Sequence, residues 1–362
     1  MMAKLSLHLA TPKDDTRPVY LTGNFNNWRT DEDQFRLQRE GEGNYAFSFP
    51  ENLDLPHPLE YKYIRGGWEN VELDEFGNHT PNRCVNQPSG SVTDVVPRWR
   101  KDGLEYNPAL LPMPEIITEE FEMPQLGKKR RISILLPHNY HAETQRRYPV
   151  IYLQDGQNLF NDHAPYGNWQ VNKKLAVLSE QGKGDVIIVA IDHGGSERIA
   201  EYTPSYANTR FGTGLGKKYA RFMADTLKPY IDKNYRTLSD REHTGIGGSS
   251  MGGLISIYAG LMYPEEFSKL MIFSPSLWVT PKIYFEAINF FQPSGKTKIY
   301  LYVGGKEGKS TVENVERFKE VLERRGMDGS PIDFELSIDP EGQHNEERWG
   351  REFPKALEWL FK

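Results

Sequence analysis

One serine of this sequence is set among glycines in a way that is typical of a catalytic nucleophile. It lies in GIGGSSMGG, residues 245–253, where Gly-x-Ser-x-Gly is centred on Ser250. Ser249 does not fit, because Met251 stands where a glycine would be needed. An apolar strand pattern precedes the stretch and a helical pattern follows it. A sharp strand-to-helix turn exposes a serine and lets the next N–H face an oxyanion. We expect Ser250 to be a nucleophile and Met251 to supply that N–H; the alternative is an ordinary glycine turn.

A nucleophilic serine needs a base, because its hydroxyl reacts poorly until the proton is removed. Of nine histidines, His344 is the one that follows Ser250. It lies between a strand pattern, DFELSI, and the last helical pattern, REFPKALEWLFK. In folds with this serine turn the chain order is serine, acid, histidine. We therefore expect His344 to be the base; the alternative is a surface histidine.

A carboxylate that orients the histidine should follow another strand between these two residues. The strand pattern KIYLYVGG is followed by Glu307, which we favour. The alternatives are Asp328, Asp333 and Asp339. Asp333 falls within a strand pattern, and Asp339 stands close before His344. Glu307 is also placed to cap the helix that follows it.

The loop after the strand pattern PVIYLQ offers a second oxyanion donor. Gly156 permits a tight backbone approach, so we expect the N–H of Gln157 to be that donor. Asp155 either lines the substrate pocket or holds the loop. Two aromatic side chains, Trp169 and Trp278, would form an apolar pocket wall, with core packing as the alternative.

A polar loop after the strand pattern DVIIVAID supplies further pocket candidates. They are Asp192, His193, Arg198 and Glu201. Function gathers at the carboxyl ends of the strands in a parallel sheet, which is where this loop lies. The alternative is that Arg198 and Glu201 form an ion pair that only fixes the loop.

Two halves of the chain differ in their periodicity. Residues 1–97 show short alternating runs separated by turn-formers, which predicts a small all-β sandwich. Residues 98–114 carry charge and prolines and are expected to be a linker. In residues 115–362 buried-strand runs alternate with amphipathic helical patterns, which predicts an α/β fold with a mostly parallel sheet.

Composition excludes several classes of function. The net charge of -6 argues against a nucleic-acid partner, and no apolar run is long enough to span a membrane. With Cys84 as the one cysteine, which we expect in the core, neither an intramolecular disulfide nor a thiolate metal site can form. We find no metal motif or phosphate loop and expect no cofactor. The N-terminus lacks a leader pattern, so we expect a cytoplasmic protein, or a secreted or periplasmic one if a leader was removed.

Residues from about 115 to 362 resemble the esterase D-like group of the Esterase family of α/β-hydrolases. The strings that carry this resemblance are YLQDGQNLF, IDHGGSERIAEYTP, LKPYIDKNYRTL, GGSSMGGL, FSPSLW, YLYVGGKEG and HNEERWGREFPKALEWLF. The resemblance implies an α/β-hydrolase fold and a Ser-His-acid triad, with Glu307 where many relatives place Asp. It implies hydrolysis of acetyl or feruloyl esters of carbohydrates through an acyl-enzyme. The alternatives are a siderophore esterase, an acyltransferase, and a glycan-binding protein with a vestigial hydrolase domain.

The N-terminal half is similar to immunoglobulin-like starch- or glycogen-binding domains. VYLTGNFNNW at 19–28 and EYKYIRGGWE at 60–69 carry the similarity. It implies that Trp28 and Trp68 stack on glucose rings while Lys62 hydrogen-bonds hydroxyls. The alternative is a module that shapes the site of a neighbouring hydrolase. The expected partner is thus a small-molecule or oligosaccharide ester, and a homo-oligomer is compatible with the sequence.

Overall fold

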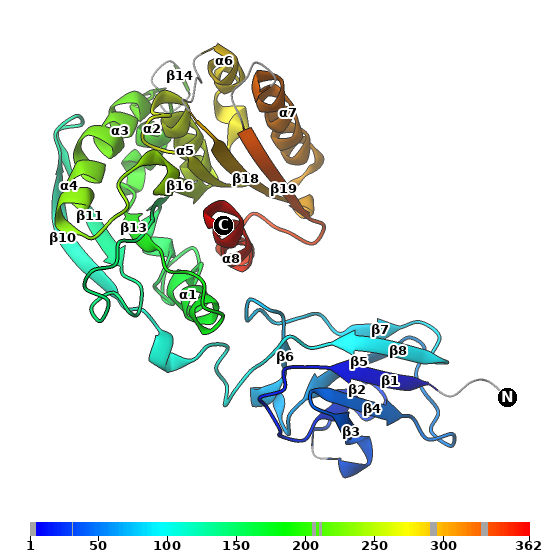
Figure 1. Ribbon diagram of the computed structural model, residues 1–362. Helices are drawn as coiled ribbons and strands as arrows, with labels where there is room; N and C mark the ends of the chain where they lie inside the picture. The colour runs from blue at the N-terminus through cyan, green and yellow to red at the C-terminus, as the bar shows by residue number, and fades with distance from the viewer. Residues whose placement is uncertain (1–4, 31, 205–207, 210–211, 290–294, 327–331) are drawn as a thin grey trace. The chain divides into compact units, whose positions relative to one another are not determined.

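The chain divides into two compact units, Met1–Leu110 and Leu111–Lys362, each described here by itself (Figure 1). The computed structural model describes residues 5–30, 32–204, 208–209, 212–289, 295–326 and 332–362. Within these ranges no helix combines the length and the apolar character needed to cross a membrane.

The first unit is built from β-strands. They are β1 (Ser6–Ala10), β2 (Tyr20–Gly23), β3 (Gln38–Gly41), β4 (Asn44–Ser48), β5 (Leu59–Ile64), β6 (Glu72–Leu73), β7 (Arg83–Val85), β8 (Ser91–Val95) and β9 (Arg98–Trp99). One sheet has the order β3-β4-β1-β8, a second the order β2-β5-β7, and β6 pairs with β9. Strand pairing thus reaches into the segment 98–114 that we expected to be a linker, because β9 belongs to this unit.

Alternating side chains of these strands make the core of the first unit. In β1, Leu7 and Leu9 are buried while His8 between them is exposed, as expected for a strand with one solvated face. Tyr61 of β5 is buried in the same cluster. The prediction of a small all-β sandwich is therefore confirmed. Cys84, expected in the core, is instead exposed, because in β7 it lies on the outward face of the strand.

The second unit contains an eight-stranded sheet of order β10-β11-β13-β12-β16-β17-β18-β19. Its strands are β10 (Pro114–Met123), β11 (Lys128–Leu135), β12 (Val150–Gln154), β13 (Ile187–Ile191), β16 (Thr244–Ser249), β17 (Lys269–Phe273), β18 (Thr297–Gly304) and β19 (Ile332–Asp339), and a separate pair is formed by β14 (Asn208–Thr209) and β15 (Gly212–Thr213). β11 pairs antiparallel with both neighbours, and every pairing from β13 to β19 is parallel. Every residue of β12, β13 and β16 is buried, as in a sheet covered on both faces.

Helices cover both faces of this sheet. They are α1 (Val171–Glu180), α2 (Arg198–Tyr202), α3 (Gly216–Phe222), α4 (Lys228–Asn234), α5 (Met251–Met262), α6 (Lys282–Asn289), α7 (Lys309–Gly326) and α8 (Glu346–Phe361). Figure 1 shows α1 and α8 on one face and α3, α4 and α5 on the other. The predicted α/β architecture with a mostly parallel sheet is therefore confirmed.

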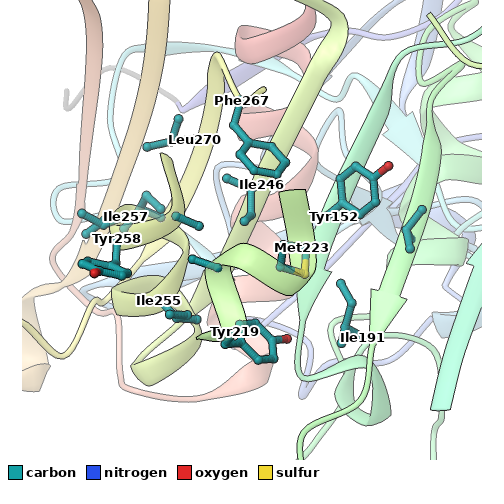
Figure 2. Packing of buried hydrophobic residues seen from close by; sticks show 14 of the residues in the cluster. Tyr152, Ile191, Tyr219, Met223, Ile246, Ile255, Ile257, Tyr258, Phe267 and Leu270 are labelled. Carbon is teal, nitrogen blue, oxygen red and sulfur yellow. The ribbon is translucent and has the colours of Figure 1, made fainter. Parts of the chain in front are cut away.

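The helix that follows β16 is the most buried one. α5 is apolar around its whole circumference, and all of its residues except Met262 are buried. Figure 2 shows Ile255, Ile257 and Tyr258 of α5 beside Ile246 of β16 and Met223. A helix packed on all sides cannot shift easily, so the position of its N-terminus is well defined.

The backbone of β16 lies so close to that of β17 that a side chain at Gly247 would collide with it, and this can be tested by substitution. A Cβ added to Gly247 would lie 2.6 Å from the carbonyl oxygen of Met271, whereas at Gly245 its nearest neighbours would be 3.2 Å away. We expect Gly247→Ala to lower the free energy of unfolding by about 1–3 kcal/mol, because strand backbone must shift. Gly245→Ala is the control in the same strand and should lose clearly less. Chemical denaturation measures both, and equal losses would contradict this account of the packing.

Candidate active site

Three neighbouring strands of the sheet end in a residue with left-handed backbone. Asp155 follows β12 with φ 59°, Ser250 follows β16 with φ 56°, and Ser274 follows β17 with φ 44°. For residues other than glycine this conformation is strained by about 1–3 kcal/mol each, and such strain gathers at functional sites. β12, β16 and β17 are adjacent, so the three turns lie side by side at the carboxyl edge of the sheet.

Ser250 occupies a sharp turn between β16 and α5, with φ 56° and ψ −120°. Its N–H donates to the carbonyl of Phe273 at 2.9 Å, which holds the turn against the end of β17. A Cβ on Gly252 would lie 2.8 Å from a carboxylate oxygen of Asp155, so only glycine allows this approach. The strand, sharp turn and helix predicted around Ser250 are all present.

The hydroxyl of Ser250 contacts a second serine that our sequence reasoning missed. Its Oγ lies 3.2 Å from Oγ of Ser276, and the N–H of Ser276 donates to the carbonyl of Ser250 at 3.0 Å. Within the described residues Ser250 makes no hydrogen bond to His344. A signal for Ser276 was available in the string FSPSLW, which begins at Phe273, the last residue of β17.

Glu307 and His344 come together at the same edge of the sheet. Nδ1 of His344 lies 2.7 Å from Oε2 of Glu307, and the Glu307 side chain is 1% exposed. Oε1 of Glu307 accepts hydrogen bonds from the Ser274 hydroxyl at 2.6 Å and from the Gly304 N–H at 2.9 Å. Burial alone would raise the pKa of Glu307, but the hydrogen bonds from His344, Ser274 and Gly304 outweigh it and hold the pKa below its usual value.

The other acidic residues considered for this role have different partners. Asp339 accepts a hydrogen bond from Arg348 at 3.3 Å, and Asp333 lies 2.7 Å from the ammonium of Lys296. Asp328 lies outside the described residues.

The turn after β12 is clamped at both ends. The carboxylate of Asp155 accepts two hydrogen bonds from Arg198, at 2.6 and 2.8 Å. The side-chain amide of Gln157 both donates to the carbonyl of His193 and accepts from its N–H, each at 3.0 Å. Among the described residues we find no hydrogen-bond partner for the backbone N–H of Gln157 or of Met251.

Arg198 does not pair with Glu201, contrary to the ion pair we considered. Because the left-handed turn at Asp155 directs that carboxylate toward α2, Arg198 binds Asp155 instead. Glu201 is fully buried and binds Arg130 at 2.7 Å and Lys128 at 3.1 Å. Arg198 binds both oxygens of the Asp155 carboxylate, which favours the alternative that Asp155 holds the loop.

His193 is partly buried, and burial lowers the pKa of its imidazole. The N–H of Gly195 donates to its Nδ1 at 3.0 Å, so in the neutral ring the proton is on Nε2.

The two candidate tryptophans have different environments. Trp169 is 2% exposed and packs against Phe273, with ring centroids 5.3 Å apart, and near Trp349 at 6.3 Å. Its ring is enclosed by other aromatic rings, which favours the alternative of core packing over a pocket wall. Trp278 is 66% exposed in the short turn that follows Ser276. It presents a large apolar surface to solvent.

Two further carboxylates lie beside the turn after β12. A Cβ added to Gly156 would lie 2.6 Å from Oδ1 of Asp192, and the amide of Asn158 donates to Glu346 at 3.2 Å. Burial raises the pKa of Asp192 to about 6 and also raises that of Glu346. Within the described ranges no three His, Cys, Asp or Glu side chains are grouped so that they could hold a metal ion.

Of the three residues of the first unit that we expect to bind glucose, the two tryptophans lie close together, whereas the ammonium of Lys62 already has hydrogen-bond partners. The rings of Trp28 and Trp68 lie 6.1 Å apart, and Trp68 is 41% exposed. The ammonium of Lys62 donates to the carbonyl of Thr80 at 2.7 Å, to its hydroxyl at 2.8 Å and to the carbonyl of Pro81 at 3.0 Å. An ammonium has three N–H donors, and these three contacts occupy them, which argues against the prediction that Lys62 hydrogen-bonds sugar hydroxyls.

The raised pKa of Asp192 predicts a pH-dependent effect on stability. The folded state binds the Asp192 proton more tightly than the unfolded chain, so this residue destabilises the fold increasingly as the pH rises from about 4 to about 6. We expect Asp192→Asn to raise the free energy of unfolding at pH 8 by about 1–2 kcal/mol, allowing for solvent screening. The increase in the free energy of unfolding should be smaller at pH 5 than at pH 8, which denaturant titrations at both pH values would measure. Asp225→Asn, at an exposed position, is the control, and a pH-independent gain would contradict the assignment.

Comparisons with known proteins place this geometry in a family. The model of the Esterase family, described as "Putative esterase", matches residues 123–360. An endo-1,4-beta-xylanase/feruloyl esterase of Xylanibacter ruminicola is 25% identical over 243 residues, which cover 65% of this chain and 30% of that protein. An alpha-amylase of Niallia circulans is 34% identical over 99 residues, 27% of this chain and 7% of the amylase.

A solved structure extends the likeness of fold along the chain. The enterobactin esterase of Shigella flexneri has a TM-score of 0.54 at 17% identity and covers 98% of this chain and 92% of its own. The family model matches more than half of the chain, in the unit that carries Ser250, Glu307 and His344. The chain therefore belongs to the Esterase family of α/β-hydrolases and is an esterase.

Proposed function

We propose that this protein is a serine carboxylesterase with Ser250 as nucleophile, His344 as base and Glu307 as the acid that orients it. The observation that carries the proposal is the strained turn of Ser250 at the sheet edge where Glu307 binds His344 at 2.7 Å. Because Glu307 accepts from Nδ1–H, the lone pair of Nε2 is free to accept the serine proton. The lowered pKa of Glu307 keeps it ionised and able to stabilise the imidazolium.

The reaction begins with a change of hydrogen-bond partner. The Ser250 hydroxyl contacts Ser276 at 3.2 Å in the resting structure, and in the proposed mechanism it leaves this partner and donates to Nε2 of His344. Catalytic hydrogen bonds are often formed only in the substrate complex. Ser250 Oγ then bonds to the ester carbonyl carbon, Nε2 takes its proton and passes it to the departing alkoxide. Water, activated by the same nitrogen, releases the acid from the acyl-enzyme.

In this proposal, two backbone N–H groups stabilise the tetrahedral intermediate. Met251 N–H is at the N-terminus of α5, and Gln157 N–H is in the clamped turn after β12. Neither has a hydrogen-bond partner among the described residues, so each is available to an oxyanion. Rigid donors of this kind contribute strongly because they need no rearrangement during reaction. The two bonds between Arg198 and Asp155 keep the second donor in place.

The charges near the site favour a neutral substrate. Asp155 neutralises Arg198, while Asp192 and Glu346 lie beside the turn with no cation bonded to them among the described residues. A ferric siderophore with several negative charges would be repelled by such a site. We therefore favour feruloyl or acetyl esters of carbohydrates, and the similarity to the xylanase/feruloyl esterase supports this choice. The exposed ring of Trp278 offers an apolar face for an aromatic acyl group.

The nucleophile assignment predicts the kinetics of one substitution. Ser250→Ala should lower kcat for p-nitrophenyl acetate and methyl ferulate by at least ~10³-fold, with a small change in KM, because binding does not need the hydroxyl. Ser249→Ala, next to it in β16, should keep most of the activity. A ferric siderophore ester is the third substrate. Preference for that ester over both neutral esters would overturn the substrate assignment, and an active Ser250→Ala would overturn the nucleophile.

The first unit offers a separate prediction about carbohydrate binding. We propose that Trp28 and Trp68 together form a stacking face for a glucan, a role that the similarity to the alpha-amylase supports. Trp68→Ala should weaken binding of maltoheptaose about tenfold or more, since covering a large apolar side chain contributes about 1.5–3 kcal/mol. Calorimetric titration measures this, with turnover of p-nitrophenyl acetate as the control that should not change. If wild type and Trp68→Ala bind maltoheptaose equally, or neither binds, the pair is not a binding face.

A further inference from the structure

Ser274 is a buried serine at the active site that the mechanism above does not use. It is the first residue after β17, it is 1% exposed, and its N–H donates to the carbonyl of Tyr302 at 2.7 Å. Its φ of 44° is left-handed, a conformation in which glycine or asparagine is the usual residue. Because serine is retained in this strained and buried position, we expect its hydroxyl to have a functional role.

The direction of the Ser274 hydroxyl is determined by a tryptophan. Nε1 of Trp349 lies 3.0 Å from Ser274 Oγ, and an indole N–H can only donate. Ser274 Oγ must therefore accept this hydrogen bond, and its own proton is left for Glu307 Oε1 at 2.6 Å. The result is a chain of directed hydrogen bonds from Trp349 through Ser274 to Glu307.

As a result of these hydrogen bonds, the two carboxylate oxygens of Glu307 have different partners. Oε1 accepts from Ser274 and from the Gly304 N–H, which leaves Oε2 to accept from Nδ1 of His344. The Trp349 ring also meets the His344 ring edge to face, with centroids 4.9 Å apart. The same tryptophan thus contacts the imidazole directly and acts on its carboxylate through Ser274.

We propose that Ser274 is a positioning residue that holds the Glu307 carboxylate in the orientation His344 needs. The proposal rests on the proposed function of Glu307 and His344. A glutamate has one more rotatable bond than an aspartate and so needs an additional restraint to present the same oxygen to the histidine. Ser274 and Gly304 supply that restraint from the ends of two adjacent strands, β17 and β18. Misorientation of a group that supports the base slows the chemical step and leaves substrate binding almost unchanged.

Ser274→Gly removes the hydroxyl without adding backbone strain, because glycine adopts left-handed φ readily. We expect kcat for p-nitrophenyl acetate to fall about ten- to a hundredfold, as for loss of a hydrogen bond to a charged group, with KM unchanged. Ser268→Ala is the matched control. Ser268 is fully buried just before β17, at the opposite end of that strand, and donates to the carbonyl of Arg241 at 2.6 Å. The Ser268→Ala variant should be less stable than the wild type but have the same kcat.

A proton NMR measurement separates this inference from the esterase mechanism. The Nδ1–H of His344, bonded to a carboxylate, should give a far-downfield resonance in the wild type that disappears in His344→Gln. We expect Ser274→Gly to broaden or shift it, and Ser268→Ala to leave it in place. Trp349→Phe keeps a ring against His344 but frees the Ser274 hydroxyl, and should give a smaller change in the same direction. It serves as the test variant if Ser274→Gly does not fold.

An unchanged resonance, or a kcat within twofold of wild type in Ser274→Gly, would overturn the proposal for Ser274. If the wild type hydrolyses no ester, the proposed function is contradicted instead. The His344 resonance still tests whether Ser274 positions Glu307.

Discussion

The left-handed turns that end β12, β16 and β17 are the constraint on which the site depends. Each redirects the chain at the point where a parallel strand leaves the sheet, so that Asp155, Ser250 and Ser274 meet at one edge. Such backbone persists only where the surrounding structure over-determines it. Here the strands are buried on both faces and α5 is enclosed by the core, which gives the turns no room to relax. The strain is localised at the turns that carry the proposed nucleophile, Ser250, and the two proposed oxyanion donors.

Two buried carboxylates serve this site in different ways. Asp155 is neutralised by Arg198 and anchors the turn that carries the N–H of Gln157. Glu307 has no arginine or lysine bonded to it among the described residues and instead accepts hydrogen bonds from Ser274, Gly304 and His344. A carboxylate held by neutral donors remains an anion that can stabilise an imidazolium, whereas one already paired with a guanidinium is largely neutralised. The arrangement of partners therefore separates the structural carboxylate of Asp155 from that of Glu307, which is suited to the proposed role of supporting His344.

Sequence patterns predicted the elements of the second unit well, because buried parallel strands and amphipathic helices leave strong signals. The segments around Ser250, Glu307 and His344 were found from their places after strand patterns, and the structure brings Glu307 to His344. Partners that depend on turn geometry could not be predicted. The pairing of Arg198 with Asp155 instead of Glu201 follows from a positive φ that no pattern reveals.

Burial was the other limit of the sequence analysis. A tryptophan in a connecting segment is equally compatible with a pocket wall and with a core position, and Trp169, just before α1, is in the core. The carbonyl groups that surround the ammonium of Lys62 come from a loop at Thr80 and Pro81, whose path depends on the whole first unit. Ser274 lies within FSPSLW, but its hydrogen bonds to Trp349 and Glu307 cannot be predicted without knowing where Trp349 lies.

The central claim is that the Ser250 hydroxyl is the group that attacks the ester. Its most direct test is reaction of the folded protein with a fluorophosphonate, followed by mass spectrometry of the peptides. The account predicts one phosphonyl group per chain, on Ser250, formed at the rate at which esterase activity is lost. Modification of Ser249 or Ser276 instead, or complete loss of activity with Ser250 unmodified, would contradict it.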